Sequence, residues 1–134
     1  MSSTNKSLIH RYLDAYNRGA MDELGDLVSV DYVHHNNGRD LTLAQFKAGA
    51  AWMRAGMPDF RVEVEDMIEE GDEVAVRYVG RGTHRGSMVG EAVTSRPIAV
   101  YGCTVFRLLE DRIAEDWEVI DEAEMMRQIG ASPA

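Results

Sequence analysis

The sequence predicts an α+β fold, in which a cone-shaped, curved antiparallel sheet is covered by three N-terminal helices and followed by a short C-terminal helix. Two observations predict it. Apolar residues recur at helical spacing as far as Met57, and from Asp59 onward they alternate with polar residues, as is typical of strands. The length of 134 residues fits a single domain that spans residues 1–134.

Three helices are expected in the N-terminal half. The first covers residues 4–18, and a second, short helix covers residues 21–28 before a brief extended piece at residues 30–33. Thr42 is followed three residues later by Gln45, which is the pattern of a capping box. We therefore expect the third helix to begin just after Thr42.

Four strands should follow as an antiparallel meander. In the first of them Phe60, Val62, Val64 and Ile68 alternate with charged residues, so they are expected to share the inward face. Residues 85–95 are expected to form a loop because they contain two glycines, Gly86 and Gly90. The expected strands cover residues 60–68, 74–84, 97–109 and 112–121, and a closing helix covers residues 122–129.

The last expected strand carries four acids in ten residues, at positions 112–121. Its more apolar face, which we expect to point inward, comprises Ile113, Glu115, Trp117, Val119 and Asp121. Pairing across the tight turn before it would place Phe106 opposite Glu115 and Thr104 opposite Trp117. A carboxylate among apolar side chains is costly to bury as an ion, so Glu115 is predicted to have a raised pKa. The other two acids, Asp116 and Glu118, are expected to be solvated.

Composition limits the partners. The formal net charge of −9 argues against nucleic acid and against anionic membrane surfaces, since both attract basic proteins. No apolar run approaches the roughly 18 residues of a membrane helix, and the N-terminus lacks the apolar core of a signal peptide. The single cysteine, Cys103, fits a reducing compartment. These features predict a cytoplasmic protein.

Several segments, together with the order of elements, fit the pattern of one family: residues 80–86 (GRGTHRG), 105–108 (VFRL) and 113–117 (IAEDW). Residues 32–36 (YVHHN) and 125–130 (MMRQIG) also fit, so the resemblance covers nearly the whole chain. In these features the sequence resembles the SnoaL-like polyketide cyclases, a family of the nuclear transport factor 2-like superfamily of cone-shaped α+β barrels.

The resemblance implies an intramolecular aldol condensation of a small, hydrophobic, carbonyl-containing ligand, without metal or cofactor. In such a reaction a pocket carboxylate removes a proton next to a carbonyl group, and hydrogen-bond donors hold the enolate. The family uses an aspartate on the late strands with a histidine nearby. Its usual acid in the middle of the third strand is Thr104 here, and its usual turn glycine is missing at residues 110–112.

Three residues are candidates for catalysis. Glu115 or Asp121 would be the base, and His84 would protonate or orient an oxygen at the mouth of the pocket. Each has an alternative role. Glu115 could be a structural partner of Arg77 or Arg107, Asp121 resembles a helix cap with Glu124 three residues on, and His84 could cap its strand and face water.

Five residues are candidates for substrate binding: His35, Asn36, Tyr16, Trp52 and Trp117. Adjacent residues of a strand point to opposite faces, so only one of His34 and His35 can face inward. From its family position we expect this to be His35, with His34 at the surface. The three aromatic residues could equally be core residues.

No metal site is predicted, because no paired ligands at helical spacing occur and only an assembly of His35, His84 and Glu115 is conceivable. Two other functions stay open. The same cone could bind a small ligand without chemistry, or it could support epoxide hydrolysis or hydroxylation. The apolar outer face that includes Tyr101, Cys103 and Val105, together with Val79, suggests a homodimer formed through the sheet.

Overall fold

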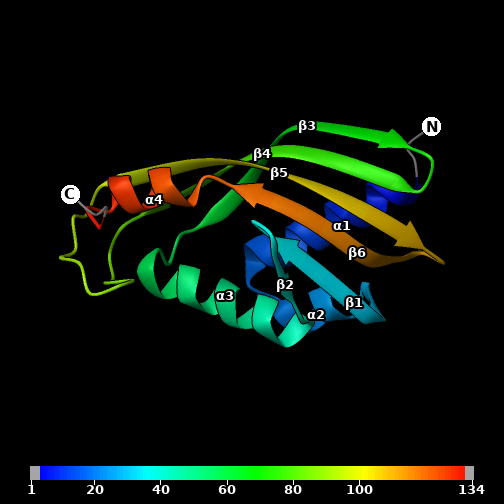
Figure 1. The fold of residues 1–134 in the computed structure, drawn as a ribbon, viewed down its shortest axis with the longest axis horizontal. Coiled ribbons are helices and arrows are strands. Elements are labelled where there is room, and N and C mark those ends of the chain that lie inside the picture. The colour runs from blue at the N-terminus through cyan, green and yellow to red at the C-terminus, as the bar shows by residue number, and fades with distance from the viewer. Residues whose placement is uncertain (1–3, 132–134) are drawn as a thin grey trace.

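The computed structural model describes residues 4–131. Figure 1 shows a curved sheet whose hollow side faces the helices. In chain order the elements are α1 (Thr4–Arg18), α2 (Met21–Gly25), β1 (Val28–Asn36), β2 (Arg39–Leu41), α3 (Leu43–Gly56), β3 (Arg61–Glu70), β4 (Glu73–Thr83), β5 (Pro97–Leu109), β6 (Arg112–Ile120) and α4 (Glu122–Gln128).

The six strands of the described chain form one curved sheet in the order β2-β1-β6-β5-β4-β3. The sheet is not closed into a barrel, because β2 and β3 are its two edge strands. This confirms the α+β prediction with three N-terminal helices and a short C-terminal one. The prediction of a wholly antiparallel sheet is wrong at one strand pair, since β1 runs parallel to β6. The extended piece expected at residues 30–33 is nine residues long, because its polar end pairs with both β2 and β6.

The helices cover the concave face of the sheet unequally. Helix α1 packs against β3 and β4, α3 lies against the β1–β2 edge, and α4 lies beside β5. The core is divided into two clusters. One joins α1 to the first half of β4 and the end of β5, and the other joins the C-terminal end of α3 to the start of β5 and to α4.

Two helix starts are fixed by side-chain caps. The Thr42 hydroxyl accepts a hydrogen bond from the Gln45 backbone N–H at 3.2 Å, and the Gln45 side chain accepts one from the Thr42 N–H at 2.9 Å. Before α4, the Asp121 carboxylate accepts a hydrogen bond from the Glu124 N–H at 3.1 Å. Both capping predictions are confirmed.

Two β-bulges reverse the facing of side chains. In β6, Ile113 pairs with Leu108 and Glu115 pairs with Arg107, so Ala114 is an extra residue without a partner on β5. In β3, Glu65 is the extra residue. Beyond each bulge the alternation changes phase, because one inserted residue moves every later side chain to the other face.

The bulge in β3 corrects one expectation. Ile68 does not share the inward face of Val62 and Val64, because it follows the bulge and pairs with Ala75 on the convex face, where it is 65% exposed. Its neighbour Met67 takes the inward position and packs against the core.

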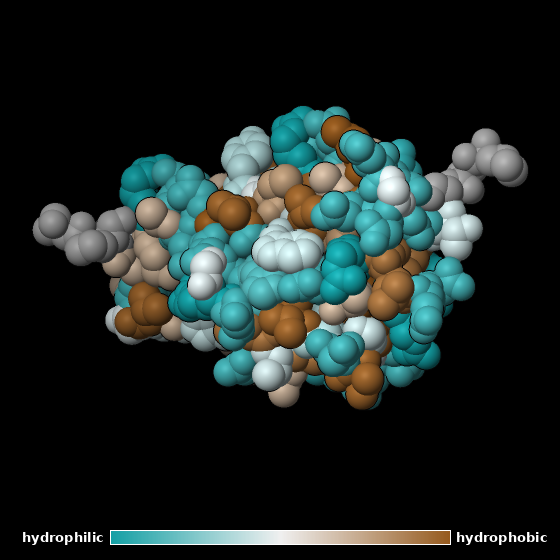
Figure 2. Space-filling view, turned by 45° about the vertical axis from the view of Figure 1, so that its right-hand side comes forward, coloured by the Kyte–Doolittle hydropathy of each residue, from teal (hydrophilic) through white to brown (hydrophobic). Residues whose placement is uncertain are grey.

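The face seen in Figure 2 is mostly hydrophilic, with hydrophobic residues exposed as small, separate patches. Such scattered exposure is normal for a globular surface. Across the described residues 4–131, every helix is too short or too polar to cross a membrane.

Candidate active site

The bulge at Ala114 determines which acids of β6 face the helices. Beyond it, Asp116 and Glu118 point to the concave side, whereas Glu115 and Trp117 point to the convex side. The sequence interpretation had this assignment the other way round. It also placed the pairing one residue out of register, since Phe106 lies opposite Asp116 and Thr104 lies opposite Glu118.

A cavity of about 460 Å³ lies between the concave face and helices α1, α3 and α4. Its walls are mostly apolar and aromatic, and include Phe46, Met53, Phe60 and Phe106. Polar groups gather on the β1–β6 side, where the inward side chains of the two strands meet. An apolar cavity with a few convergent polar groups is the usual form of a small-molecule site.

Asp116 is the innermost carboxylate of the cavity, with only 1% of its side chain exposed. One oxygen accepts a hydrogen bond from the Tyr32 hydroxyl at 2.6 Å, and the other is hydrogen-bonded to Nδ1 of His34. Asp116 and His34 are directly paired across the parallel strands β6 and β1. A charge buried this deeply needs such partners, because an unpaired carboxylate would be costly to bury.

Glu118 lies one row further along β6 and is more accessible, with 18% of its side chain exposed. Its Oε1 accepts a hydrogen bond from Asn36 Nδ2 at 2.9 Å and lies 3.5 Å from His34 Nε2. Its Oε2 accepts a hydrogen bond from the Tyr78 hydroxyl. Glu118 is therefore the carboxylate of this cluster that a molecule in the cavity can reach.

His34 links the two carboxylates. Burial by itself would lower the pKa of His34, but the hydrogen bonds to Asp116 and Glu118 outweigh it and raise that pKa to about 9. The ring is therefore protonated at neutral pH and donates from both nitrogens. An edge-on contact with Phe46, with ring centroids 4.8 Å apart, holds the ring in place.

The tyrosines around the carboxylates are held as neutral hydroxyls. Burial raises the pKa of Tyr32, and the neighbouring charge of Asp116 raises it further. Burial likewise raises the pKa of Tyr78, with Glu118 as the next largest cause. Tyr16 also lines the cavity, and burial raises its pKa too. All three phenols can therefore donate hydrogen bonds at neutral pH.

Glu115 lies outside the cavity, on the convex face. Its carboxylate is bonded to His35 Nε2 at 2.6 Å and to Arg107 Nη2 at 3.0 Å. The hydrogen bond from His35, followed by that from Arg107, lowers the pKa of Glu115, so the predicted raised pKa is wrong. The pairing with Arg107 was the alternative considered for this residue. Trp117 is exposed beside it and stacks on His35, with ring centroids 5.3 Å apart.

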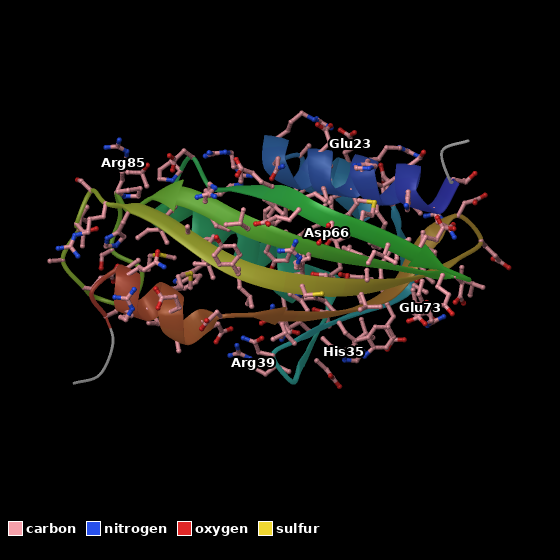
Figure 3. The ribbon with its side chains drawn as sticks, turned by 90° about the horizontal axis from the view of Figure 1, so that it is seen from above. Glu23, His35, Arg39, Asp66, Glu73 and Arg85 are labelled. Atoms are coloured by element: carbon pink, nitrogen blue, oxygen red, sulfur yellow. The ribbon has the colours of Figure 1, made fainter. Side chains whose placement is uncertain are left out.

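The facing of the two adjacent histidines is also the reverse of what was expected. His34 is buried in the cavity wall, whereas His35 lies on the convex face between Glu115 and Asp40. Figure 3 shows His35 and Arg39 on the same side of the molecule, at the β1–β2 edge. The expectation rested on family position alone, whereas the parallel pairing of His34 with Asp116 and of His35 with Trp117 decides which face each ring takes.

His84 is neither at the mouth of the cavity nor in contact with water. It is completely buried at the end of β4, and its ring is bonded to Glu91 at 2.6 Å and to Thr94 at 2.9 Å. The Thr94 backbone N–H donates to Nδ1, so the ring proton is on Nε2 and points to Glu91. His84 thereby secures the loop between β4 and β5.

The remaining predicted residues divide into two groups. Asn36, Tyr16 and Trp52 line the cavity as expected. Asp121 is exposed and caps α4, and it does not line the cavity. Within residues 4–131, no three side chains of His, Cys, Asp or Glu have an arrangement that could hold a metal ion.

Sequence reasoning missed His34, Asp116, Glu118 and Tyr78 as members of the site. A usable signal was present in the spacing, since His34 and Asn36 in one strand match Asp116 and Glu118 in the other at the same period of two. Two polar residues repeated on one face of each of two neighbouring strands indicate a shared polar row.

Comparison with known proteins confirms the resemblance. Residues 6–129 match the family described as SnoaL-like polyketide cyclase, and the chain therefore belongs to this family. The aklanonic acid methyl ester cyclase of Streptomyces peucetius is 24% identical over 133 residues, covering 96% of this chain and 92% of that enzyme. The enzyme of the same name from Streptomyces galilaeus is 26% identical over 126 residues, covering 91% and 88%.

Solved structures show the same fold. IdmH from Streptomyces antibioticus, described as a candidate polyketide cyclase, is 28% identical with a TM-score of 0.86, covering 94% of this chain and 98% of that one. AclR from Streptomyces galilaeus, described as a candidate hydroxylase, is 24% identical with a TM-score of 0.88, covering 97% and 83%. The latter likeness is one of fold alone.

Proposed function

We propose that this protein is an enzyme that closes a ring by an intramolecular aldol reaction in a small, mainly apolar polyketide-type substrate, without a cofactor. The observation that supports this best is the position of Glu118, a partly accessible carboxylate on the wall of an otherwise apolar cavity. Membership of the cyclase family and the names of the two relatives point to the same chemistry.

In this proposal Glu118 is the base. It takes a proton from a carbon next to a carbonyl group, and the resulting enolate carbon attacks a second carbonyl of the same molecule. A carbon–carbon bond forms, and the new alkoxide takes the proton back from Glu118. One carboxylate can serve both steps because it is regenerated, and general acid–base catalysis of this kind contributes about 10²- to 10⁴-fold in rate.

In this proposal Asp116 and His34, which are more deeply buried than Glu118, hold Glu118 in position. The imidazolium of His34 lies between the two carboxylates, so Glu118 is adjacent to a fixed positive charge while Asp116 holds the ring in orientation. We assign His34 and Asp116 as positioning residues, because their side chains are almost completely buried whereas Glu118 is partly accessible from the cavity. Tyr16, on α1, also lines the cavity, and in this proposal its hydroxyl donates a hydrogen bond to the enolate oxygen.

The proposal can be tested with aklanonic acid methyl ester, the compound in the names of the relatives. Formation of a cyclised product is followed by chromatography for the wild type and for Glu118→Gln. We expect the substitution to reduce turnover by at least about 100-fold, since it removes the base without changing the shape of the side chain.

Glu115→Gln is the matched control, because Glu115 is three residues before Glu118 on the same strand but on the convex face. Its turnover should stay within a factor of two of the wild type. Unchanged turnover in Glu118→Gln would contradict the assignment of the base. Binding of the ester without any product, even by the wild type, would favour the alternative of a non-catalytic binding protein.

We also propose that two copies pair through the convex face of the sheet. Tyr101 and Val119 are 59% and 69% exposed there, next to Trp117 and Cys103, although Val79 is buried by its neighbours. Exposed apolar side chains grouped on one sheet face are typical of an interaction surface. Light scattering at micromolar concentration tests this, and a monomeric mass would rule the pairing out.

A further inference from the structure

On the concave face, Tyr78 reaches Glu118 across an intervening strand. Val76, Thr104 and Glu118 form one row of the sheet, and the next row comprises Tyr78 on β4, Gly102 on β5 and Ile120 on β6. Tyr78 is therefore neither adjacent to Glu118 in register nor on a neighbouring strand. Its hydroxyl nevertheless donates a hydrogen bond to Glu118 Oε2, so its side chain must pass over β5.

Gly102 makes this crossing possible. A Cβ atom at this position would lie 2.5 Å from Cζ of Tyr78 and closer still to the hydroxyl oxygen. Side-chain carbon atoms do not approach so closely, so any other residue would displace the end of the Tyr78 ring. Tyr78 is only 4% exposed, so the ring could be displaced only towards the cavity that it lines.

The geometry points to a positioning role: Tyr78, seated over Gly102, holds the Glu118 carboxylate in the orientation that proton transfer requires. This inference rests on the proposed function, in which Glu118 is the base, and it adds two residues to that function. Tyr78 and Gly102 do not exchange the proton themselves.

The hydrogen bonds of Glu118 explain how orientation is achieved. A glutamate side chain has three rotatable bonds, so a single contact does not fix its carboxylate plane. Asn36 fixes Oε1 and Tyr78 fixes Oε2, so both ends of the carboxylate are held. Each carboxylate oxygen has two lone pairs, and Tyr78 occupies one at Oε2, which leaves a second for the substrate proton.

Burial keeps Tyr78 suited to this role. It raises the pKa of the phenol, and the charge of Glu118 raises it further, so the hydroxyl remains a donor throughout the neutral range. Thr104, in the row beside Gly102, also lines the cavity and is paired with Glu118.

The test compares Gly102→Ala, which keeps the Tyr78 hydroxyl but displaces it, with Tyr78→Phe, which removes the hydroxyl alone. The control is Gly25→Ala at the end of α2, where an added Cβ meets chiefly the flexible side chains of Lys47 and Leu43. Circular dichroism establishes that each variant is folded. The first readout is the Tyr78 hydroxyl proton by NMR in ligand-free protein, where a hydrogen bond to a carboxylate gives a downfield, slowly exchanging signal.

We expect this signal in the wild type and in Gly25→Ala, and its loss in Gly102→Ala. With aklanonic acid methyl ester as probe, kcat should fall about tenfold in Gly102→Ala and in Tyr78→Phe, while KM stays within a factor of two. The double variant should be no slower than the slower single variant, because both substitutions remove the same hydrogen bond.

Full retention of the hydroxyl signal in Gly102→Ala would overturn the role of Gly102, and unchanged kcat in Tyr78→Phe would overturn that of Tyr78. If Gly102→Ala does not fold, Tyr78→Phe decides, since it removes a single oxygen. Failure of the proposed function is distinguishable: Glu118→Gln would then keep full turnover, whereas the NMR signal would still report whether Tyr78 is held on Glu118.

Discussion

Nδ1 of His34 is hydrogen-bonded to the carboxylate of Asp116, and both side chains are almost completely buried. The pair joins β1 to β6, the first and last strands in chain order, and the two residues are 82 positions apart in sequence. The residues next to each of them in sequence do not indicate that it is buried, and their partnership depends on the parallel contact between β1 and β6.

Stability should depend on the protonation of His34. Its pKa is raised from 6.5 to about 9 in the folded protein, so the stabilisation is fully present below pH 6.5 and is lost as the pH rises through 9. The loss should be on the order of 3 kcal/mol in the free energy of unfolding, measured by urea denaturation between pH 6 and pH 9.5. His34→Asn should flatten this dependence, whereas His10→Asn, at an exposed position of α1, should leave it unchanged.

Replacing Asp116 should cost far more stability than replacing Glu115. In Asp116→Asn the buried imidazolium of His34 loses its closest counter-charge, and we expect the free energy of unfolding to fall by about 3 kcal/mol. Glu115→Gln removes a partly exposed ion pair and should cost less than about 1 kcal/mol. Urea denaturation at pH 7 measures both. Equal losses would show that the two carboxylates are not buried as unequally as described.

Tyr16→Phe should reduce activity without reducing stability. The Tyr16 hydroxyl lines the cavity, and no hydrogen bond from it is found within residues 4–131, so its removal leaves no buried partner unsatisfied. If it stabilises the enolate oxygen, kcat for the methyl ester should fall about 100-fold. Tyr101→Phe, on the convex face, is the control. A loss of less than twofold would remove Tyr16 from the mechanism.

Glu91→Gln should loosen the loop between β4 and β5. Burial would raise the pKa of Glu91, but the backbone N–H groups of Val89 and Met88, together with His84, lower it to about 2. Gln presents one oxygen where four donors converge, from His84, Ser87, Met88 and Val89, so we expect a loss of about 1–3 kcal/mol in the free energy of unfolding. Hydrogen exchange of the Met88 and Val89 amides should accelerate. Glu73→Gln, at an exposed position of β4, should change neither.

Much of the fold was predictable from the sequence because its signals are local. The periodicity of α1, the capping box at Thr42 and the long alternation of β5 give α1 and β5 their observed bounds and place the start of α3 correctly. The cap at Asp121 was predictable for the same reason. Each signal depends on residues within a few positions of one another, and neighbouring strands do not alter it.

The facing of the site residues was not predictable in this way. A bulge is decided by how two strands pair, and Ala114 has no local feature that marks it as an extra residue. Counting by two from Ile113 therefore gives the wrong face for Glu115 and for everything after it. Which of His34 and His35 faces inward was chosen from family position, and it too is decided by a pairing with β6 that the local sequence does not show.

The extra residue in β6 also affects how this protein should be compared with its relatives. A relative that lacks the residue at Ala114, aligned without a gap, would have its cavity carboxylate placed in the column of Glu115 or Trp117. Percentage identity would hardly change, yet the transferred catalytic assignment would fall on the outside of the molecule. For this family, assignments are safer when they follow strand pairing than when they follow alignment columns.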